Sequence, residues 1–278
     1  MAKLIFLYLL LFMVAAVALK LLVVVLEPRL TFLPIRGLYR SPADVGIPFQ
    51  EITIRTADGE KVYSWLLEHP ESTVEVLFFH GNGGNLSLWQ DFLIGLYHHS
   101  LSVFALDYRG YGKSTGSPTE EGLYRDTEAL VGHFWDKVHR LDHKVIYWGR
   151  SLGGSIAAFA TTIRKPDGLI LEGSFPSKQS LLNHYPVLKI LGIFSKYRFP
   201  TTEFLDGLSR PVLIIHGDQD SVIPFKEGQK LFEQLKTEKY FHTLPGANHN
   251  DLHLVDPKSY WESITQFIDL IGSGQDSH

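Results

Sequence analysis

The chain has 278 residues, enough for one large domain with an appendage or for two small domains. Its 26 basic and 30 acidic residues give a net charge of -4, and no run of lysines and arginines is interleaved with aromatic residues, so nucleic acid is not expected as a partner. The absence of cysteine excludes disulfides, thiolate metal sites and a cysteine nucleophile, and the 13 histidines show no HExxH spacing, so neither a metal site nor a cofactor is predicted.

The first predicted element is an apolar helix over residues 4–26, in which Lys20 is the only charged residue. At about 1.5 Å of rise per residue this run spans roughly 30 Å, the thickness of the hydrocarbon core of a bilayer. We therefore assign residues 1–27 as a transmembrane anchor. A cleaved signal peptide is the main alternative, but cleavage after the small residues 16–18 would leave the apolar residues 21–26 exposed. A core helix of a soluble domain is disfavoured because it need not be apolar on every face.

The sequence leaves open which side of the membrane the remainder occupies. Arg29, Arg36 and Arg40 follow the anchor and favour a cytoplasmic domain by the positive-inside rule. A short N-terminal tail more often stays inside, which would place the domain outside instead. Residues 28–49 contain four prolines and are predicted to form an irregular tether, whose apolar residues lie in the membrane interface or pack on the domain.

From about residue 50 the pattern becomes that of a domain in which strands alternate with helices. A hairpin is predicted from strands at 51–55 and 62–67 around the turn Asp58-Gly59. Continuous apolar runs separated by helices indicate a mostly parallel, doubly wound α/β sheet, which we assign to residues 50–278. Further strands are predicted at 76–79, 103–106, 145–148, 169–171, 212–215 and 240–244, and helices near 86–97, 119–139, 152–164, 225–237 and 257–270.

A G-x-S-x-G sequence, residues 149–153, follows the strand at 145–148 and precedes a helix. This context is typical of a nucleophile elbow, a strained turn that lifts a serine oxygen above the sheet. We therefore predict Ser151 as the nucleophile. For the adjacent Arg150 the sequence suggests only a structural salt bridge.

A serine hydroxyl needs a base to take its proton and an acid to orient that base. Polar loops that follow two later strands provide both, because chemistry in such sheets gathers beyond the C-terminal ends of the strands. Asp220 lies just past the strand at 212–215 and is the predicted acid, and His249 lies in the loop after the last strand and is the predicted base.

Other residues compete for these two roles. Asp218 and Glu172 are alternative acids, although Asp218 is better placed to stabilise its own turn. His253 is an alternative base, but it is expected to begin the following helix. His216 and His80 stand at strand ends and are expected to be hydrogen-bonded structural residues.

An oxyanion that forms during acyl transfer needs backbone N–H donors already aimed at it. Leu152, which follows the nucleophile, is the first predicted donor. The second is Asn82, in the loop 80–85 after the strand at 76–79, where three glycines let the backbone approach a substrate closely. A phosphate-binding loop is the alternative interpretation, but no GK[ST] follows.

Together these residues resemble the α/β-hydrolase superfamily over roughly residues 50–270. The loop 107–114 is similar to the D-x-R-G-x-G-x-S sequence of that family, and 216–224 is similar to its acid loop, in which the second aspartate is catalytic. An N-terminal anchor followed by HGNGGN, GRSLGG and GANHND resembles the single-pass membrane-anchored hydrolases, a group that includes protein depalmitoylases. The resemblance implies hydrolysis of esters or thioesters without a cofactor.

Residues 174–209 are expected to form a small cap insertion over the site. They are aromatic and apolar with interspersed lysines, so the cap is expected either to shape an acyl pocket and contact lipid headgroups or only to pack on the core. The predicted function is that of a membrane-anchored serine hydrolase acting on lipid-like or acylated substrates. A serine aminopeptidase-like peptidase is one alternative, although the cap shows no obvious acidic anchor for an amine. A non-catalytic binding protein is another, although such chains usually lose a triad residue.

Overall fold

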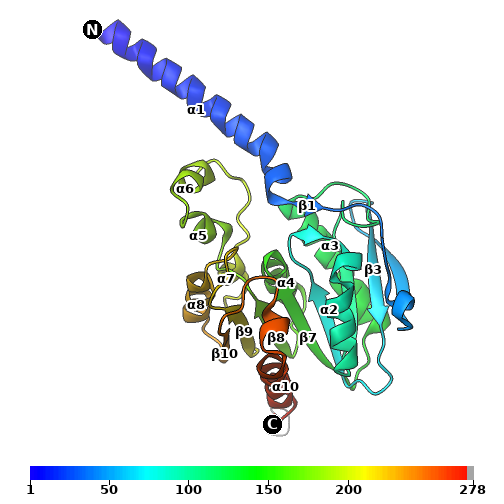
Figure 1. Ribbon diagram of the computed structural model, residues 1–278. Coiled ribbons are helices and arrows are strands. Elements are labelled where there is room, and N and C mark those ends of the chain that lie inside the picture. The colour runs from blue at the N-terminus through cyan, green and yellow to red at the C-terminus, as the bar shows by residue number, and fades with distance from the viewer. Residues whose placement is uncertain (274–278) are drawn as a thin grey trace.

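A computed structural model describes residues 1–273 and places an eight-stranded sheet between two layers of helices (Figure 1). The strand order is β10-β9-β8-β7-β4-β6-β3-β2, and only the pairs that involve β3 are antiparallel. The mostly parallel α/β sheet predicted from the sequence is therefore confirmed. The strands are β2 (Gln50–Arg55), β3 (Lys61–Leu67), β4 (Val74–Phe79), β6 (Ser102–Asp107), β7 (Lys144–Arg150), β8 (Gly168–Glu172), β9 (Val212–Gly217) and β10 (Lys239–Leu244).

Helices cover both faces of the sheet, which explains why its central strands are apolar without alternation. Tyr147 and Trp148 of β7 are both fully buried, yet they belong to separate core clusters on opposite faces. The predicted helix at 119–139 is a helix to His133 and then a π-helical turn over Phe134–Val138. One layer contains α2 (Leu86–His98) and α10 (Pro257–Ser273), and the other contains α3 (Glu120–His133), α4 (Leu152–Ile163) and α8 (Phe225–Gln234).

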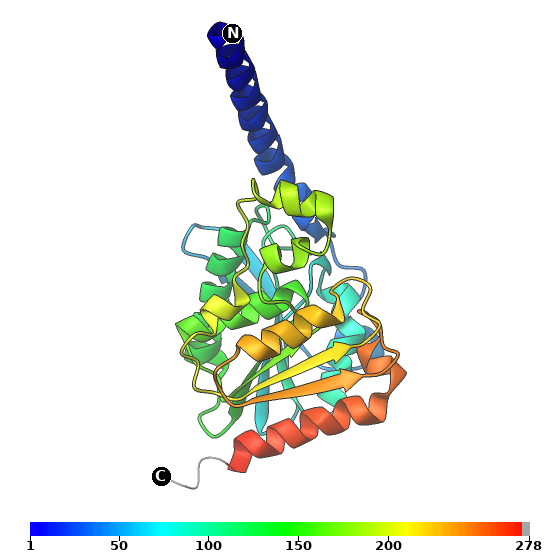
Figure 2. The same ribbon diagram turned by 90° about the vertical axis from the view of Figure 1, so that its left-hand side faces the viewer.

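The N-terminal helix α1 (Ala2–Thr31) projects away from the domain and is long and apolar enough to cross a membrane (Figures 1 and 2). It continues past the boundary expected at residue 27, with Pro28 inside it. A proline lacks the N–H that would donate to residue 24, but its carbonyl still accepts the N–H of Phe32 at 3.0 Å, so the helical hydrogen-bond pattern continues past it.

Of the two arrangements left open for the tether, the structure shows the one in which it packs on the domain. Its strand β1 (Leu33–Pro34) pairs in parallel with β5 (Gly83–Gly84), and a short 3-10 helix covers Pro42–Val45. The side-chain amide of Asn85 donates to the carbonyls of Ile35 and Gly37 at 3.0 and 2.7 Å. The tether is therefore an ordered edge of the domain, and β5 lies within the loop 80–85.

The cap insertion contains three short helices, α5 (Lys178–Leu182), α6 (Pro186–Gly192) and α7 (Thr201–Phe204). Figures 1 and 2 show α6 beside the end of α1 that meets the domain. The cap starts at Ser174, directly after β8, so it begins at the C-terminal edge of the sheet.

Candidate active site

The turn between β7 and α4 holds Ser151 in a backbone conformation that few non-glycine residues adopt. Its φ is 55° and its ψ is -121°, which is the strained geometry expected of a nucleophile elbow. The turn closes only around glycines: a Cβ on Gly153 would lie 1.9 Å from the carbonyl oxygen of Phe79, and one on Gly149 would lie 2.2 Å from that of Gly153. The local sequence therefore dictates the shape of the turn.

The segment 172–174 fixes the backbone of Ser151. The N–H of Ser151 donates to the carbonyl of Glu172 at 2.8 Å, and the hydroxyl of Ser174 donates to the carbonyl of Ser151 at 3.1 Å. Between them, Gly173 has a φ of 53° and leaves room for an imidazole: a Cβ there would lie 3.2 Å from Cε1 of His249. Ser151 and the ring of His249 thus flank the same three residues.

His249 and Asp220 are hydrogen-bonded, with 2.7 Å between Nδ1 and Oδ2. The other carboxylate oxygen of Asp220 accepts the N–H groups of Val222 and Ile223, and Nε2 of His216 lies 3.3 Å from Oδ2. Burial opposes ionisation of Asp220, but the hydrogen bonds from His216 and His249 outweigh it and hold the pKa of Asp220 below its usual range. An ionised Asp220 on Nδ1 leaves Nε2 of His249 as the nitrogen that can take a proton.

The competing acids and base have other partners. Asp218 accepts the N–H of Gly246 at 2.8 Å, which ties its turn to the loop after β10. The ring of His253 packs against those of Phe92 and Tyr260, with centroid distances of 5.5 and 6.2 Å. These contacts are those of structural residues.

Glu172 forms the salt bridge that the sequence suggested for Arg150, as part of a buried network whose other members the sequence did not indicate. The two residues are neighbours across β7 and β8, with 3.3 Å between Nε and Oε1, and Glu172 also accepts hydrogen bonds from Trp148 and Tyr260. The guanidinium of Arg150 donates to the carbonyl of His249 at 3.0 Å. Arg150 therefore connects the nucleophile turn to the loop that carries His249.

The two predicted oxyanion donors, Leu152 and Asn82, both have backbone N–H groups that the described protein leaves open. Leu152 is the first residue of α4, and neither its N–H nor that of Asn82 has an acceptor within residues 1–273. The loop of Asn82 passes close to the nucleophile, since a Cβ on Gly81 would lie 3.4 Å from that of Ser151. The hydroxyl of Tyr111 donates to the carbonyl of Asn82 at 2.7 Å and holds the loop in place.

Asp107, at the end of β6, makes contacts at both ends of the loop 80–85 that contains Asn82. Its Oδ1 accepts the N–H of Leu86 at 2.8 Å and lies 3.7 Å from Nε2 of His80. Burial raises the pKa of Asp107 to about 7 and lowers that of His80 to about 4, so neither stabilises a charge on the other near neutrality.

We expect Asp107→Asn to remove a pH dependence of stability. A folded-state pKa raised above its unfolded value means that the folded state binds the proton more tightly, so stability falls as pH rises from about 4 to about 7. Between pH 5 and pH 8 the wild type should therefore lose about 2.5 kcal/mol more unfolding free energy than the asparagine variant. Denaturant unfolding of both proteins at pH 5 and pH 8 measures this difference. An equal change in the free energy of unfolding of the two proteins would contradict the prediction.

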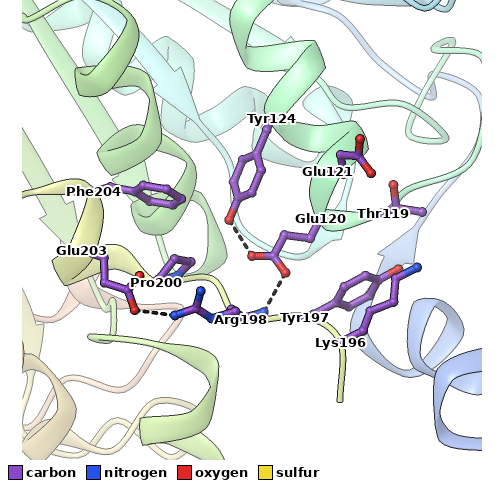
Figure 3. Close-up of a pocket in the computed structure, with 10 residues that line it drawn as sticks. All are labelled: Thr119, Glu120, Glu121, Tyr124, Lys196, Tyr197, Arg198, Pro200, Glu203 and Phe204. Carbon is purple, nitrogen blue, oxygen red and sulfur yellow. Dashed lines mark hydrogen bonds and ion pairs between the residues drawn. The ribbon is translucent and has the colours of Figure 1, made fainter. Parts of the chain in front are cut away.

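A cavity of about 580 Å³ lies between the start of α3 and the last part of the cap (Figure 3). Ser151, Asp220 and His249 are not among its described lining residues. Glu120 is its most buried acid, and both of its oxygens are engaged: the N–H groups of Arg198 and Phe199 and the hydroxyl of Tyr124 all donate to it at 2.6 Å. Glu120 therefore fastens the cap to α3.

The sequence and the fold are similar to those of known hydrolases. The profile of the family described as "Serine aminopeptidase, S33" matches residues 70–209. An uncharacterized membrane protein of Saccharomyces cerevisiae is 30% identical over 236 residues, which cover 82% of each chain. The alpha/beta hydrolase domain-containing protein 17B of Homo sapiens is 32% identical over 216 residues, 77% of this chain and 73% of that protein. The fold of a Pyrococcus furiosus esterase matches with a TM-score of 0.73 at 18% identity, over 87% of this chain and 98% of the esterase.

Proposed function

The chain belongs to the α/β-hydrolase superfamily, and we propose that it is a membrane-anchored serine hydrolase that cleaves esters or thioesters of lipid-like or acylated substrates. The observation that carries the proposal is the strained Ser151 turn beside a His249–Asp220 hydrogen bond of 2.7 Å. Such a constellation converts a hydroxyl into a nucleophile.

In the proposed reaction the hydroxyl oxygen of Ser151 attacks the carbonyl carbon of the substrate while Nε2 of His249 takes the hydroxyl proton. The N–H groups of Leu152 and Asn82 stabilise the resulting oxyanion. His249 then gives the proton to the departing alcohol or thiol, and an acyl group remains on Ser151. Water attacks this acyl-enzyme with His249 again as the base, which releases the acid and regenerates the hydroxyl.

The proposal assigns α1 as a retained, single-pass anchor rather than a cleaved leader. Glu27, at the end of α1, is 4% exposed and accepts hydrogen bonds from the cap, and Phe32 is 2% exposed in the core. A cleavage after residue 18 would leave an apolar stub attached to these buried residues. The yeast relative is itself described as a membrane protein.

We favour esters or thioesters as substrates over peptides with a free amino terminus. An aminopeptidase holds the substrate ammonium on a carboxylate, and the buried Glu120 near the cap has both oxygens occupied by hydrogen bonds from the protein. Glu203 beside it is paired with Arg198 at 2.6 Å. The solved esterases of the same fold point in the same direction.

A fluorophosphonate probe on the detergent-solubilised full chain tests the proposal. Wild type should be labelled and should hydrolyse p-nitrophenyl and thioester acyl substrates, and Ser151→Ala should lose both activities. Ser155→Ala is the matched control, because Ser155 is a fully buried serine of α4 and should not affect labelling. Turnover of aminoacyl p-nitroanilides in preference to esters would favour the peptidase. Absence of labelling in a folded wild type would contradict the serine hydrolase.

A further inference from the structure

The cap presents an exposed aliphatic surface to its surroundings. Val187, Ile190 and Ile193 are 69%, 61% and 74% exposed, and their spacing of three residues places them on one side of α6 and the turn after it. We call these three residues the α6 face. Clustered aliphatic side chains that no other part of the protein covers mark a contact surface.

The segment that follows the α6 face returns to the last turns of α1 and is fixed there by a buried carboxylate. Glu27 accepts the N–H of Lys196 at 2.9 Å, the hydroxyl of Ser195, and the ammonium of Lys178 at 2.7 Å. The same ammonium donates to the hydroxyl of Thr31 at 3.1 Å. We call this set of contacts the Glu27 clasp, and it joins the cap to the anchor helix itself.

Aromatic packing next to the Glu27 clasp adds further contacts between the end of α1 and the cap. The ring of Phe32 lies 5.5 Å from that of Tyr197 and 6.2 Å from that of Phe199, measured between centroids. Glu120 accepts the backbone N–H of Arg198, as Figure 3 shows, and also that of Phe199. The cap segment 195–199 is thus held between α1 and α3. These contacts fix the position of the α6 face along the axis of α1, close to Glu27.

If α1 spans a bilayer, this position along its axis falls at the boundary between the hydrocarbon core and the headgroups. The apolar run of α1 covers residues 4–26, and about 20 helical residues already span a hydrocarbon core of roughly 30 Å. Glu27 and Arg29 are the first charged residues after Lys20, so the clasp lies where hydrocarbon gives way to headgroups. Figures 1 and 2 both show α6 beside this end of α1, on the side of the domain from which α1 projects.

We propose that the α6 face is a membrane-contacting surface that inserts into the interface of the bilayer crossed by α1, at a depth set by the Glu27 clasp. The inference rests on the part of the proposed function in which α1 spans the membrane. Lys189 lies within α6 and Lys196 follows the face in the sequence, and long lysine side chains can reach headgroup phosphates while their stems stay in the apolar layer. The cap that carries the α6 face begins at Ser174, whose hydroxyl donates to the carbonyl of Ser151, so the proposed membrane contact and the nucleophile turn belong to adjoining segments.

Depth-dependent quenching tests the proposal, and the cysteine-free chain makes labelling simple. The full chain is prepared with one cysteine, Ile190→Cys on the α6 face or Val14→Cys in α1, labelled with a polarity-sensitive fluorophore and placed one chain per phosphatidylcholine nanodisc. The matched control is Leu141→Cys, a 98% exposed apolar residue just before β7, at the opposite end of the sheet from Ser151. Nitroxide groups on the lipid acyl chains should quench most of the fluorescence at positions 14 and 190 and leave position 141 unchanged.

The outcomes separate the α6 face from the anchor. Quenching at position 14 with none at 190 overturns the proposal and leaves the anchor in place. A blue shift at 190 without quenching indicates a protein neighbour instead of lipid and also overturns it. Loss of quenching at both positions rejects the spanning helix together with the α6 face, while the labelling of Ser151 stays unaffected. Glu27→Gln should reduce quenching at 190 and not at 14, and unchanged quenching at 190 would overturn the role of the clasp.

Discussion

The variant His249→Ala is expected to lower kcat on p-nitrophenyl esters by about 10⁶-fold, and the double variant Ser151→Ala/His249→Ala to lose little more. Nucleophile and base act as one unit, so removal of either leaves only the oxyanion donors and substrate binding. Asp220→Asn should cost less, about 10⁴-fold, because the imidazole stays in place but the hydrogen bond to Nδ1 at 2.7 Å then favours the wrong tautomer.

Steady-state kinetics on the purified variants measure these losses. His253→Ala serves as the matched control, because its ring packs against those of Phe92 and Tyr260 and its nearest charged groups are Arg150, Glu172 and Asp251 rather than Asp220. That control should retain turnover within about tenfold. Losses that multiply in the double variant would show that Ser151 and His249 act independently, which contradicts the proposed triad.

The second large effect is expected from Arg150→Met. Glu172 is fully buried, and removing its cationic partner leaves an uncompensated charge in the core, a change that costs about 3–5 kcal/mol. For a domain of this size the melting temperature should fall by roughly 10 °C. The carbonyl of His249 also loses its hydrogen bond from the guanidinium, so kcat should fall as well.

A double variant separates these two roles of Arg150. Arg150→Met/Glu172→Gln removes the unpaired charge and should recover most of the stability, whereas kcat should stay low because the loop of His249 is still not held. Thermal unfolding and kcat are measured on the same preparations. Recovery of kcat together with stability would mean that Arg150 serves the fold alone and does not position His249.

The sequence predicted the sheet and the loops around the nucleophile because their signals are local. A strand buried on both faces is a continuous apolar run, as in Tyr147 and Trp148, and the glycines around Ser151 are required by contacts inside one turn. The helix α1 runs four residues past the anchor boundary predicted at residue 27, because the apolar run sets the length of the span and Pro28 does not end the helix.

Contacts between segments distant in the chain could not be predicted in the same way. Arg150 and Glu172 become neighbours only through the register of β7 with β8, and the third member of their network is a backbone carbonyl, which has no sequence signal. The pairing of β1 with β5 involves two residues on each side, too few for any periodicity, and joins Leu33 to Gly83 across the domain.

That pairing bears on how a soluble form of the enzyme can be obtained. A fragment that starts at residue 50, where the sheet begins, would discard the strand against which Gly83–Gly84 is aligned and both carbonyls that receive the amide of Asn85. A fragment that starts at Phe32 keeps these contacts and gives up only the Glu27 clasp. A cut at the end of α1 therefore keeps the strand that supports the loop of Asn82 attached to the domain, whereas a cut within residues 38–49 would separate the two.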